Sequence, residues 1–383
     1  MRILSVTTSY PLTRDSASGI FVARLLRELA RQHEVTVVTP AATLPAEVLG
    51  PEHVVTVRYA PMSLQVLAHK PGGIPVQLRQ SPAAWLLVPL LLGGLVWKLL
   101  QQGRRADVLH ANWAIAALPA AFAGRLWGLP VVTTLRGDDV TGAAQRRISR
   151  WIMAMALKVS KKVVVVSASM QEQLTATFPD VRNKLVFIPN GVAVTRQTES
   201  SRLHGRRLLA VGSLIERKQI DVILRALVQL PEGYTLTVVG EGPEEVALLR
   251  LADRLGVTAR ITWTGSRAPE SMGELYAGHD LLVHAARSEG RPNVVVEALA
   301  AGVPVAGSDI PGVREILEHS AGGVLFPVGN EKELAASIRD LLESPEKWKA
   351  CSAAGPRWVE RERLSWSGCA QRYTALFEMV RAH

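Results

Sequence analysis

Residues 208–240 of the chain read LLAVGSLIERKQIDVILRALVQLPEGYTLTVVG, and their pattern of apolar residues decides the fold class. Continuous apolar runs at Leu208–Val211 and Leu236–Val239 predict two buried strands, each closed by a glycine. Between them, Ile220–Leu230 has the apolar spacing of a helix. Strand, helix and strand in this order are typical of a parallel sheet covered by helices on both faces.

The same alternation continues on both sides of this stretch. Hydrophobic residues make up 48% of the 383 residues, which is enough to fill two cores. We therefore expect an α/β protein with two Rossmann-like, doubly wound lobes. Further strands are expected at Ile3–Thr7, Val35–Val38, Val131–Leu135, Lys162–Val166, Ile261–Thr264, Leu281–His284 and Val303–Ala306, and further helices at Phe21–Arg31 and Trp366–Val380.

The boundary between the lobes is expected near a strong turn signal, Pro189-Asn190-Gly191, which is followed by a polar, irregular segment at 195–205. This gives a first lobe at 1–192, a second at 203–365, and a C-terminal helix at 366–383 that returns to the first lobe. Ligands of doubly wound sheets bind at the carboxyl ends of the strands. With two facing lobes, we expect the active site in the cleft between them.

Composition restricts the compartment and the partners. Cys351 and Cys369 form neither a disulfide framework nor a zinc pattern, and the N-terminus lacks the order of a signal peptide, so a cytoplasmic protein is expected. Residues 1–190 hold 21 basic and 10 acidic side chains, against 23 and 24 in the rest. This asymmetry indicates an anionic partner. With 5% aromatic residues and no RNA-binding signature, nucleic acid is not expected.

The most specific chemical signal is SEGRPN at 288–293, followed by VVVEALAAGVPV. Glu289 lies in a loop after a predicted strand. Glu297 lies one turn inside a helix that is expected to start near Asn293. The free N–H groups and the dipole at the start of a helix favour anions and sugar hydroxyls.

With these residues the sequence resembles the family-4 glycosyltransferases of the bacterial surface-polysaccharide type, which have the GT-B fold. The resemblance covers nearly the whole chain and is strongest from Leu208 to Phe326. It implies that Glu297 binds the ribose of a nucleotide-sugar donor, and that Glu289 binds the donor sugar together with backbone N–H groups of Gly290, Arg291 and Asn293. The alternative for Glu297 is a carboxylate that only stabilises the helix dipole.

The phosphate contacts are implied by VGSLIERKQIDVIL at 211–224. The family usually has an arginine just after the glycine and a lysine about five residues later, both of which hold the diphosphate. Here Lys218 matches the lysine, whereas Ser213 replaces the arginine. Arg217 and Arg287 are the two candidates for the missing charge. The alternative for Lys218 is a solvated lysine at the start of a helix.

In the first lobe, VVTTLRGDDV at 131–140 departs from the family pattern. Where the family usually has a histidine that contacts the donor sugar, this chain has Arg136, which we therefore assign to the catalytic site. Asp138 and Asp139 follow. Adjacent carboxylates in a strand point to opposite faces, so we do not expect them to share a metal. The resemblance likewise implies no metal.

Two glycine loops complete the predicted donor site. Gly19 belongs to the small-residue loop Ser16–Phe21, whose backbone N–H groups can approach an anion. The resemblance implies that this loop faces the diphosphate and the acceptor across the cleft. The alternative for this loop is an ordinary helix N-terminus. Gly265 and Arg267 lie at the end of another predicted strand and resemble the loop of the family that contacts the base.

Two stretches without acidic residues favour contact between the first lobe and an anionic membrane surface. Residues 53–106 contain the apolar run WLLVPLLLGGLVW, which falls just short of a spanning helix and is interrupted by a proline and two glycines. Residues 140–171 contain a basic amphipathic helix, for which the alternative is a core helix with a solvated basic face. The first stretch carries Lys70, Arg79, Lys98, Arg104 and Arg105; the second carries Arg146, Arg150, Lys158 and Lys161, with an apolar face of Ile148, Trp151, Ile152 and Met155.

The resemblance implies a retaining hexosyltransferase, and the composition and the basic, apolar stretches predict that it is cytoplasmic and peripheral on the inner face of the plasma membrane. The expected acceptor is a lipid-linked or growing cell-surface polysaccharide. Two alternatives remain: a sugar-nucleotide epimerase of GT-B fold, and a non-catalytic member that binds only nucleotide or membrane. Ser213 keeps the second alternative open, because it removes one cation from the diphosphate site.

Overall fold

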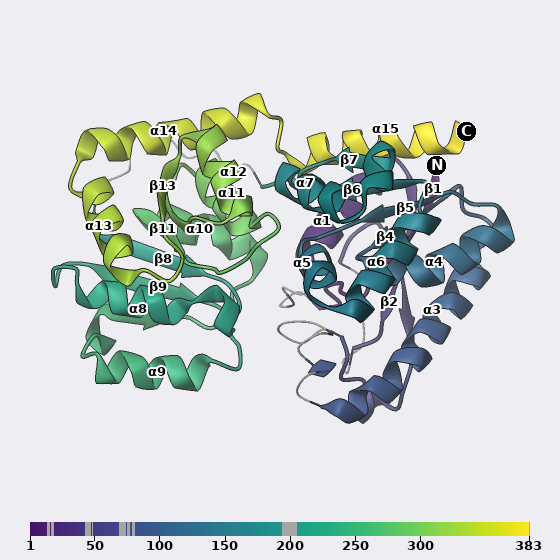
Figure 1. Cartoon of the computed structure of the whole chain (residues 1–383), viewed down its shortest axis with the longest axis horizontal. Coiled ribbons are helices and arrows are strands. Elements are labelled where there is room, and N and C mark those ends of the chain that lie inside the picture. The colour runs from purple at the N-terminus through teal and green to yellow at the C-terminus, as the bar shows by residue number, and fades with distance from the viewer. Residues whose placement is uncertain are drawn as a thin grey trace. The chain divides into compact units, whose positions relative to one another are not determined.

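Strands and helices alternate along both halves of the chain in the computed structural model, which describes residues 1–13, 16, 19–42, 47, 49–68, 74, 77–78, 81–193 and 205–382. The chain divides into two units. The first unit comprises Met1–Gly191 together with Trp366–His383, and the second comprises Val192–Ser365. Each unit contains one parallel sheet with helices on both faces (Figure 1), as the strand and helix pattern predicts.

The first unit has a seven-stranded sheet in the order β3-β2-β1-β4-β5-β6-β7. The order reverses between β1 and β4, which is the position where doubly wound sheets bind ligands. The predicted strands form with small shifts at their ends, whereas β3 and β7 at the two edges and β4 in the middle of the sheet lie outside the predictions. The strands are β1 (Arg2–Val6), β2 (Glu34–Pro40), β3 (His53–Val57), β4 (Val108–Asn112), β5 (Val131–Thr134), β6 (Lys162–Val165) and β7 (Leu185–Phe187).

Two groups of helices cover this sheet. α1 and α15 pack together on one face, around a core that includes Leu25, Tyr373 and Phe377. α3, α4 and α6 cover the other face, around a core that includes Leu95, Ala120 and Met153. The elements are α1 (Ile20–Leu29), η1 (Met62–Leu64), η2 (Pro82–Leu86), α3 (Leu87–Gly103), α4 (Ala114–Trp127), α5 (Asp138–Gln145), α6 (Arg147–Val159), α7 (Ala168–Thr177), η3 (Pro179–Lys184) and α15 (Trp366–Ala382).

The apolar run that the sequence analysis treats as interrupted forms an unbroken helix. Pro89 is the third residue of α3, where a missing N–H costs no intrahelical hydrogen bond. Gly94 lets the helix approach the sheet, since a Cβ there would lie 2.5 Å from Val57 Cγ1. Ala83–Gly103, 21 residues with a mean hydropathy of 1.9, has the length and composition of a spanning helix, alone among the helices described, and 22% of it is buried.

α6 is amphipathic, and the side chains that it buries are not those of the predicted apolar face. Met153, Ala156 and Leu157 are buried, whereas Ile148 and Trp151 are exposed. The core contact of α6 with α4 is therefore made by a different face, which carries Met153, Ala156 and Leu157, and the membrane contact of the predicted apolar face stays a prediction. Of the basic residues expected around these stretches, Lys70 and Arg79 lie outside the described residues.

The second unit has a six-stranded parallel sheet in the order β10-β9-β8-β11-β12-β13. The predicted strand Val303–Ala306 begins two residues later, because the N–H of Val303 closes the turn after α11 on Ala298 O and Pro304 has no N–H for the ladder. The strands are β8 (Arg207–Val211), β9 (Thr235–Val239), β10 (Ile261–Trp263), β11 (Leu281–His284), β12 (Val305–Ser308) and β13 (Gly323–Phe326).

Helices flank both faces of this second sheet as well. α8 packs against α13 on one side, and α11 packs against α14 on the other (Figure 1). The elements are η5 (Glu216–Lys218), α8 (Ile220–Val228), α9 (Glu245–Arg254), η6 (Thr258–Arg260), η7 (Pro269–Ser271), α10 (Met272–Ala277), α11 (Asn293–Ala300), α12 (Pro311–Ser320), α13 (Glu331–Leu342) and α14 (Pro345–Arg361).

Candidate active site

A cluster of charged side chains lies at the carboxyl ends of β8 and β11 in the second unit. β8 ends at Val211 and is followed by Gly212, whose φ of 151° suits glycine and whose hydrogen lies over the Lys218 side chain. The short helix η5 then carries Arg217 and Lys218. The loop after β11 carries Glu289. Strand ends that are neighbours in the sheet thus bring together residues that are 71 and 72 positions apart.

Glu289 is held by two cations. Lys218 Nζ forms an ion pair with Glu289 Oε1, and Arg217 Nη1 lies 3.5 Å from the same oxygen. Arg217 Nη1 also donates to the carbonyl oxygen of Ser288 at 2.9 Å. Burial opposes ionisation of Glu289, but the charges of Lys218 and Arg217 outweigh it and lower its pKa to about 2. The carboxylate is therefore ionised at neutral pH.

His284, the last residue of β11, is a member of this cluster that the sequence analysis missed. Its side chain is buried. Burial, and secondarily the charge of Lys218, lower its pKa to about 3, so the imidazole is neutral at pH 7. The sequence does contain a signal for His284, because it is a polar residue at the end of a predicted strand, directly before the loop that carries Glu289.

The structure distinguishes the two candidates for the missing cation. Arg217 lies beside Lys218 at the Glu289 carboxylate. Arg287 instead pairs with Glu216, its Nη1 lying 3.0 Å from Glu216 Oε1, and its side chain is mostly exposed. Ser213, which follows Gly212, accepts a hydrogen bond from the N–H of Ile215 through its carbonyl. Arg217 is therefore the second cation of the cluster.

Helix α11 begins at Asn293, as predicted, and carries Glu297 one turn further on. Tyr276, on α10, donates its hydroxyl hydrogen to Glu297 Oε2 at 3.1 Å. The sequence analysis missed this tyrosine, since no spacing relates α10 to α11. The hydroxyl of Tyr276 thus orients one carboxylate oxygen of Glu297, one turn after the start of α11.

The side chain of Arg291 turns into the second unit. It is 8% exposed, its Nη1 lies 3.6 Å from Glu315 Oε1, and its guanidinium lies 5.7 Å from the centre of the Trp358 ring. Burial lowers its pKa to about 10. Only the backbone of Arg291 is thus left to contact a ligand, as the resemblance implies. Gly290 packs closely against Gly312 at the start of α12, where a Cβ would lie 2.6 Å from Gly290 O.

The loop after β10 lies at the same edge of the sheet. Gly265 adopts a φ of 65° and its carbonyl accepts from the N–H of Gly240, which follows β9, at 2.9 Å. The N–H of Ser266 donates to Glu241 Oε1 at 3.0 Å. Arg267 is exposed beside them. The second unit therefore brings the loops after β8, β9, β10 and β11 to one edge.

In the first unit, Arg136 lies two residues after the end of β5 and is held by neutral partners. Its Nη1 donates to Asn190 Oδ1 and its Nη2 to Asn112 Oδ1, both at 2.6 Å. Its guanidinium lies 5.1 Å from the centre of the Phe21 ring. Among the described residues, no carboxylate lies within ion-pair distance of it. Burial lowers its pKa, but arginine remains charged.

Asp138 and Asp139 are not in a strand, so that expectation is wrong. They begin helix α5, because Gly137 ends the extended segment with a φ of 117°. Asp139 Oδ1 accepts from the N–H groups of Arg136, Gly137 and Val140 at 3.1 Å, and its Oδ2 accepts from the N–H of Ala114. Asp139 thus fixes the backbone that carries Arg136.

Gly19 lies in the first unit, immediately before α1. Its φ of 68° is left-handed, and a Cβ there would lie 2.2 Å from Ser9 O, so only glycine fits. Two residues later, α1 carries Phe21, the ring beneath Arg136. Gly19 and Arg136 are therefore linked through α1. Ala17 and Ser18 of the predicted loop lie outside the described residues.

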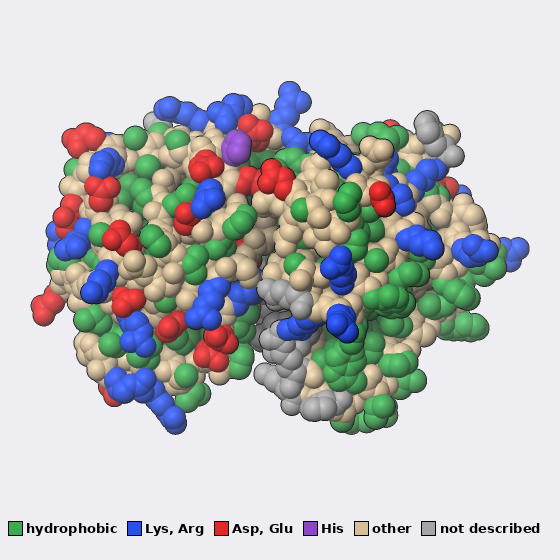
Figure 2. Space-filling model, viewed as in Figure 1, with side chains coloured by type: hydrophobic (Ala, Val, Ile, Leu, Met, Phe, Trp, Pro, Cys, Tyr) green, Lys and Arg blue, Asp and Glu red, His purple; other side chains and the backbone are tan. Residues whose placement is uncertain are grey.

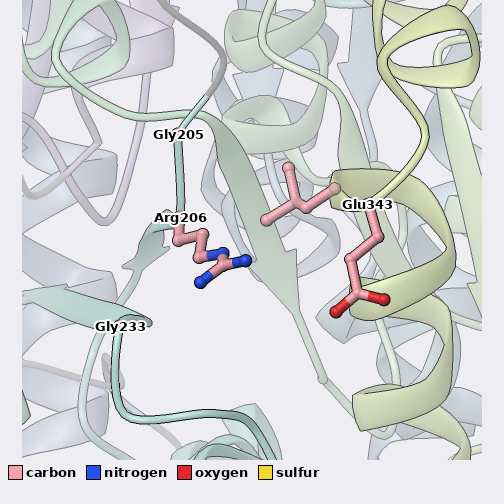
Figure 3. A pocket seen from close by; sticks show the side chains of 5 residues that line it. Gly205, Arg206, Gly233 and Glu343 are labelled. Carbon is pink, nitrogen blue, oxygen red and sulfur yellow. The ribbon is translucent and has the colours of Figure 1, made fainter.

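A cavity of about 590 Å³ lies at the opposite edge of the second sheet. It is lined by Gly205, Arg206, Gly233, Leu342 and Glu343, and the side chains of Arg206 and Glu343 point into it (Figure 3). Arg206 and Gly233 precede β8 and β9. Parallel sheets bind ligands at their carboxyl ends, so this cavity is not the candidate site.

Comparison with known proteins identifies both halves of the chain. Residues 18–196 match the family described as Glycosyltransferase Family 4, and residues 194–358 match Glycosyl transferases group 1. The D-inositol 3-phosphate glycosyltransferase of Thermobispora bispora is 27% identical over 350 residues, covering 82% of this chain and 81% of that protein. The lipopolysaccharide core biosynthesis glycosyltransferase LpsD of Rhizobium meliloti is 30% identical over 171 residues, covering 45% and 49%. The structure of Anabaena HepE in complex with UDP-glucose superposes with a TM-score of 0.77 at 20% identity, covering 99% of this chain and all of that one.

Proposed function

Because this chain belongs to glycosyltransferase family 4, we propose that it transfers a sugar from a nucleotide-sugar donor to a lipid-linked or growing cell-surface glycan. It is a retaining glycosyltransferase of the GT-B fold and uses a nucleotide-sugar donor. The acceptor class, the residue roles and the cytoplasmic, membrane-peripheral location are parts of the proposal.

The observation that carries the proposal is the pairing of Glu289 with Lys218 and Arg217 at the carboxyl ends of β8 and β11. A diphosphate leaving group requires cations where its charge develops. Lys218 and Arg217 supply two of them without the arginine that Ser213 replaces. Glu289 remains ionised beside them. When the donor binds, the side chains of Lys218 and Arg217 turn to the phosphates and the carboxylate of Glu289 accepts hydrogen bonds from the sugar hydroxyls.

The nucleoside end of the donor is assigned to α11. Glu297, oriented by Tyr276, is assigned to the ribose hydroxyls. The backbone N–H groups at Gly290 and Asn293 lie at the helix start, where the dipole favours negative charge. The loop of Gly265 and Arg267 is assigned to the base, because it lies at the same sheet edge as the loop of Gly240.

Arg136 takes the role of the family histidine in contacting the donor sugar. Its two terminal nitrogens are fixed by Asn112 and Asn190, so the guanidinium is preorganised and adds a permanent charge. Gly19 allows backbone N–H groups to approach the phosphates from the first unit. That the two units face each other across a cleft stays a prediction.

The acceptor site is assigned to the first unit, and its lipid-linked glycan is inferred from the charge of this unit and from a relative. The excess of basic residues in 1–190 suits an acceptor with phosphate groups or one presented at an anionic membrane. The Rhizobium relative is named for lipopolysaccharide core biosynthesis. A lipid-linked glycan on the cytoplasmic side of the plasma membrane combines both features.

Incubation with UDP-, GDP- and ADP-sugars, with and without lipid-linked glycan from membrane extracts, tests the proposal. UDP-glucose is tried first, because HepE was solved with it. A glycoside with the donor's anomeric configuration by NMR is expected only when acceptor is present. Conversion of the donor sugar into its epimer without a glycoside, or tight nucleotide binding without any turnover, would contradict it.

A further inference from the structure

Large apolar side chains gather on the outer surface of one helical layer of the first unit. Nine of the seventeen exposed large hydrophobic side chains of the described residues belong to η2, α3, α4 and α6. α4 packs against both α3 and α6, so the exposed side chains share one layer. Figure 2 shows apolar side chains gathered over α3 and α4. We call the set Trp85, Leu86, Leu90, Trp97, Phe122 and Leu126 the apolar face.

α3 is apolar on two opposite sides. Leu91, Leu95 and Leu99 point inward and are at most 2% exposed. Leu86, Leu90 and Trp97, at a helical spacing of four and seven residues, point outward and are 77%, 56% and 62% exposed. Single exposed apolar residues are common on proteins, but contiguous apolar surfaces of this kind mark interaction sites.

The charged residues on the helices that carry this layer are all basic. Residues 82–103, 114–127 and 147–159 contain no Asp or Glu. The exposed Arg104 and Arg105 follow α3 directly. The basic residues within these helices are Lys98, Arg125, Arg147, Arg150 and Lys158. A second copy of this chain would bring cations against cations, so self-association through this face is disfavoured. An apolar surface with a cationic rim and exposed tryptophans fits an anionic lipid surface.

We propose that the apolar face inserts into the interfacial region of an anionic membrane leaflet, with α3 lying in the membrane plane. α3 does not span the bilayer in this arrangement, because its inward leucines form part of the core of the first unit. Trp85 and Trp97 occupy the headgroup level, and Leu86 and Leu90 reach the acyl chains. Arg104 and Arg105 contact anionic headgroups at the end of the helix.

The biological use of this surface rests on the proposed function, since a lipid-linked acceptor would then be reached from the membrane by the first unit. Vesicle binding itself requires no sugar transfer. The two proposals can therefore fail separately. A wild type that transfers sugar to a soluble acceptor but does not bind vesicles would refute only the membrane contact of the apolar face. A wild type that binds vesicles but transfers no sugar to a lipid-linked acceptor would refute only the acceptor assignment.

Vesicle flotation tests the insertion. The protein is mixed with phosphatidylcholine vesicles with and without phosphatidylglycerol. The double variant Leu90→Glu/Trp97→Glu is expected to lower affinity for anionic vesicles about tenfold or more, since both side chains lose apolar contact. The matched control, Val246→Glu/Leu249→Glu, places the same charges on exposed apolar residues of α9 in the second unit and is expected to bind like the wild type.

A second pair of variants tests the cationic rim. Each basic residue near an anionic surface contributes about fivefold in affinity, so Arg104→Gln/Arg105→Gln is expected to weaken binding about twentyfold or more. Arg250→Gln/Arg254→Gln on α9 removes the same charge as a control. Donor hydrolysis in the absence of vesicles is expected to be unchanged in all four variants, which shows that they fold.

Three results would overturn the inference. One is equal affinity of the wild type and Leu90→Glu/Trp97→Glu for anionic vesicles. Another is equal binding of the wild type to neutral and anionic vesicles. The third is a lipid-free wild type that is dimeric by light scattering and becomes monomeric in Leu90→Glu/Trp97→Glu, which would assign the apolar face to a second copy of the chain.

Discussion

Lys218 on η5 forms an ion pair with Glu289 in the loop after β11, although the two residues are 71 positions apart in the chain. Both side chains are largely buried. A buried pair of this kind is costly to assemble and is weak evidence for stability. Its position at the carboxyl edge of a parallel sheet, with a second cation beside it, is better explained by phosphate and sugar binding.

Lys218→Ala is therefore expected to impair transfer far more than folding. Removing one group that stabilises developing charge lowers kcat by about 10²–10³-fold, and we expect a loss of this size. Steady-state kinetics with saturating donor measure it. Lys332→Ala, an exposed lysine at the start of α13, serves as the matched control. A Lys218→Ala enzyme with at least a tenth of the wild-type kcat would contradict the role assigned to Lys218.

Glu297→Ala is expected to abolish transfer while the thermal unfolding temperature stays close to that of the wild type. Glu297 lies one turn inside α11, and its removal costs the fold one hydrogen bond from Tyr276, about 1–3 kcal/mol. Glu318→Ala, an exposed glutamate of α12, is the control. Wild-type turnover in Glu297→Ala would leave the carboxylate only its structural role.

Tyr276→Phe tests whether nucleotide binding by Glu297 depends on its orientation by the hydroxyl of Tyr276. The tyrosine donates one hydrogen bond to the charged carboxylate, and loss of such a bond weakens an interaction by about tenfold. We expect KM for the donor to rise by about this factor, with a smaller change in kcat. Titration of nucleotide binding by calorimetry checks it independently. Unchanged nucleotide affinity would show that Glu297 does not depend on this phenol.

The sequence predicted the two sheets well because buried parallel strands are short, continuous apolar runs. Leu281–His284 was placed without error, and α11 begins at the predicted Asn293. Val303 was misplaced because an apolar residue in a turn has the same hydropathy as one in a strand; only the N–H of Val303, bonded to Ala298 O, distinguishes them.

Contacts between distant elements could not be predicted. Tyr276, His284 and Glu315 reach the site residues from α10, β11 and α12, and no local pattern specifies such packing. Asp138 and Asp139 were treated as part of a strand because carboxylates close after a glycine occur both in strands and at helix starts, and the φ of 117° at Gly137 decides between them. The choice of Arg217 over Arg287 likewise depended on side-chain geometry.

A leucine-to-alanine substitution is expected to have a large effect on stability on the buried face of α3 and a small effect on its exposed face. Leu95→Ala creates a cavity in the core of the first unit and is expected to lower the free energy of unfolding by about 2–5 kcal/mol. Leu90→Ala, one turn and a residue earlier on the exposed side, is expected to change it by less than about 0.5 kcal/mol. Urea unfolding followed by circular dichroism compares them. Similar losses in the two variants would mean that both faces of α3 are buried.

Acid is expected to destabilise the protein through two buried histidines. Burial lowers the pKa of His110 in the first unit and of His284 in the second from 6.5 to about 3. Below pH 6.5 the unfolded chain takes up protons that the folded chain does not bind, so the stability is complete above pH 6.5 and is lost as pH falls. Each histidine contributes a slope of about 1.4 kcal/mol per pH unit between pH 6 and pH 5. Urea unfolding at these pH values measures the slope. His110→Asn and His284→Asn are each expected to reduce it, whereas His53→Asn, at an exposed position, is the control. An unchanged slope in both buried-site variants would show that these imidazoles are protonated in the folded protein.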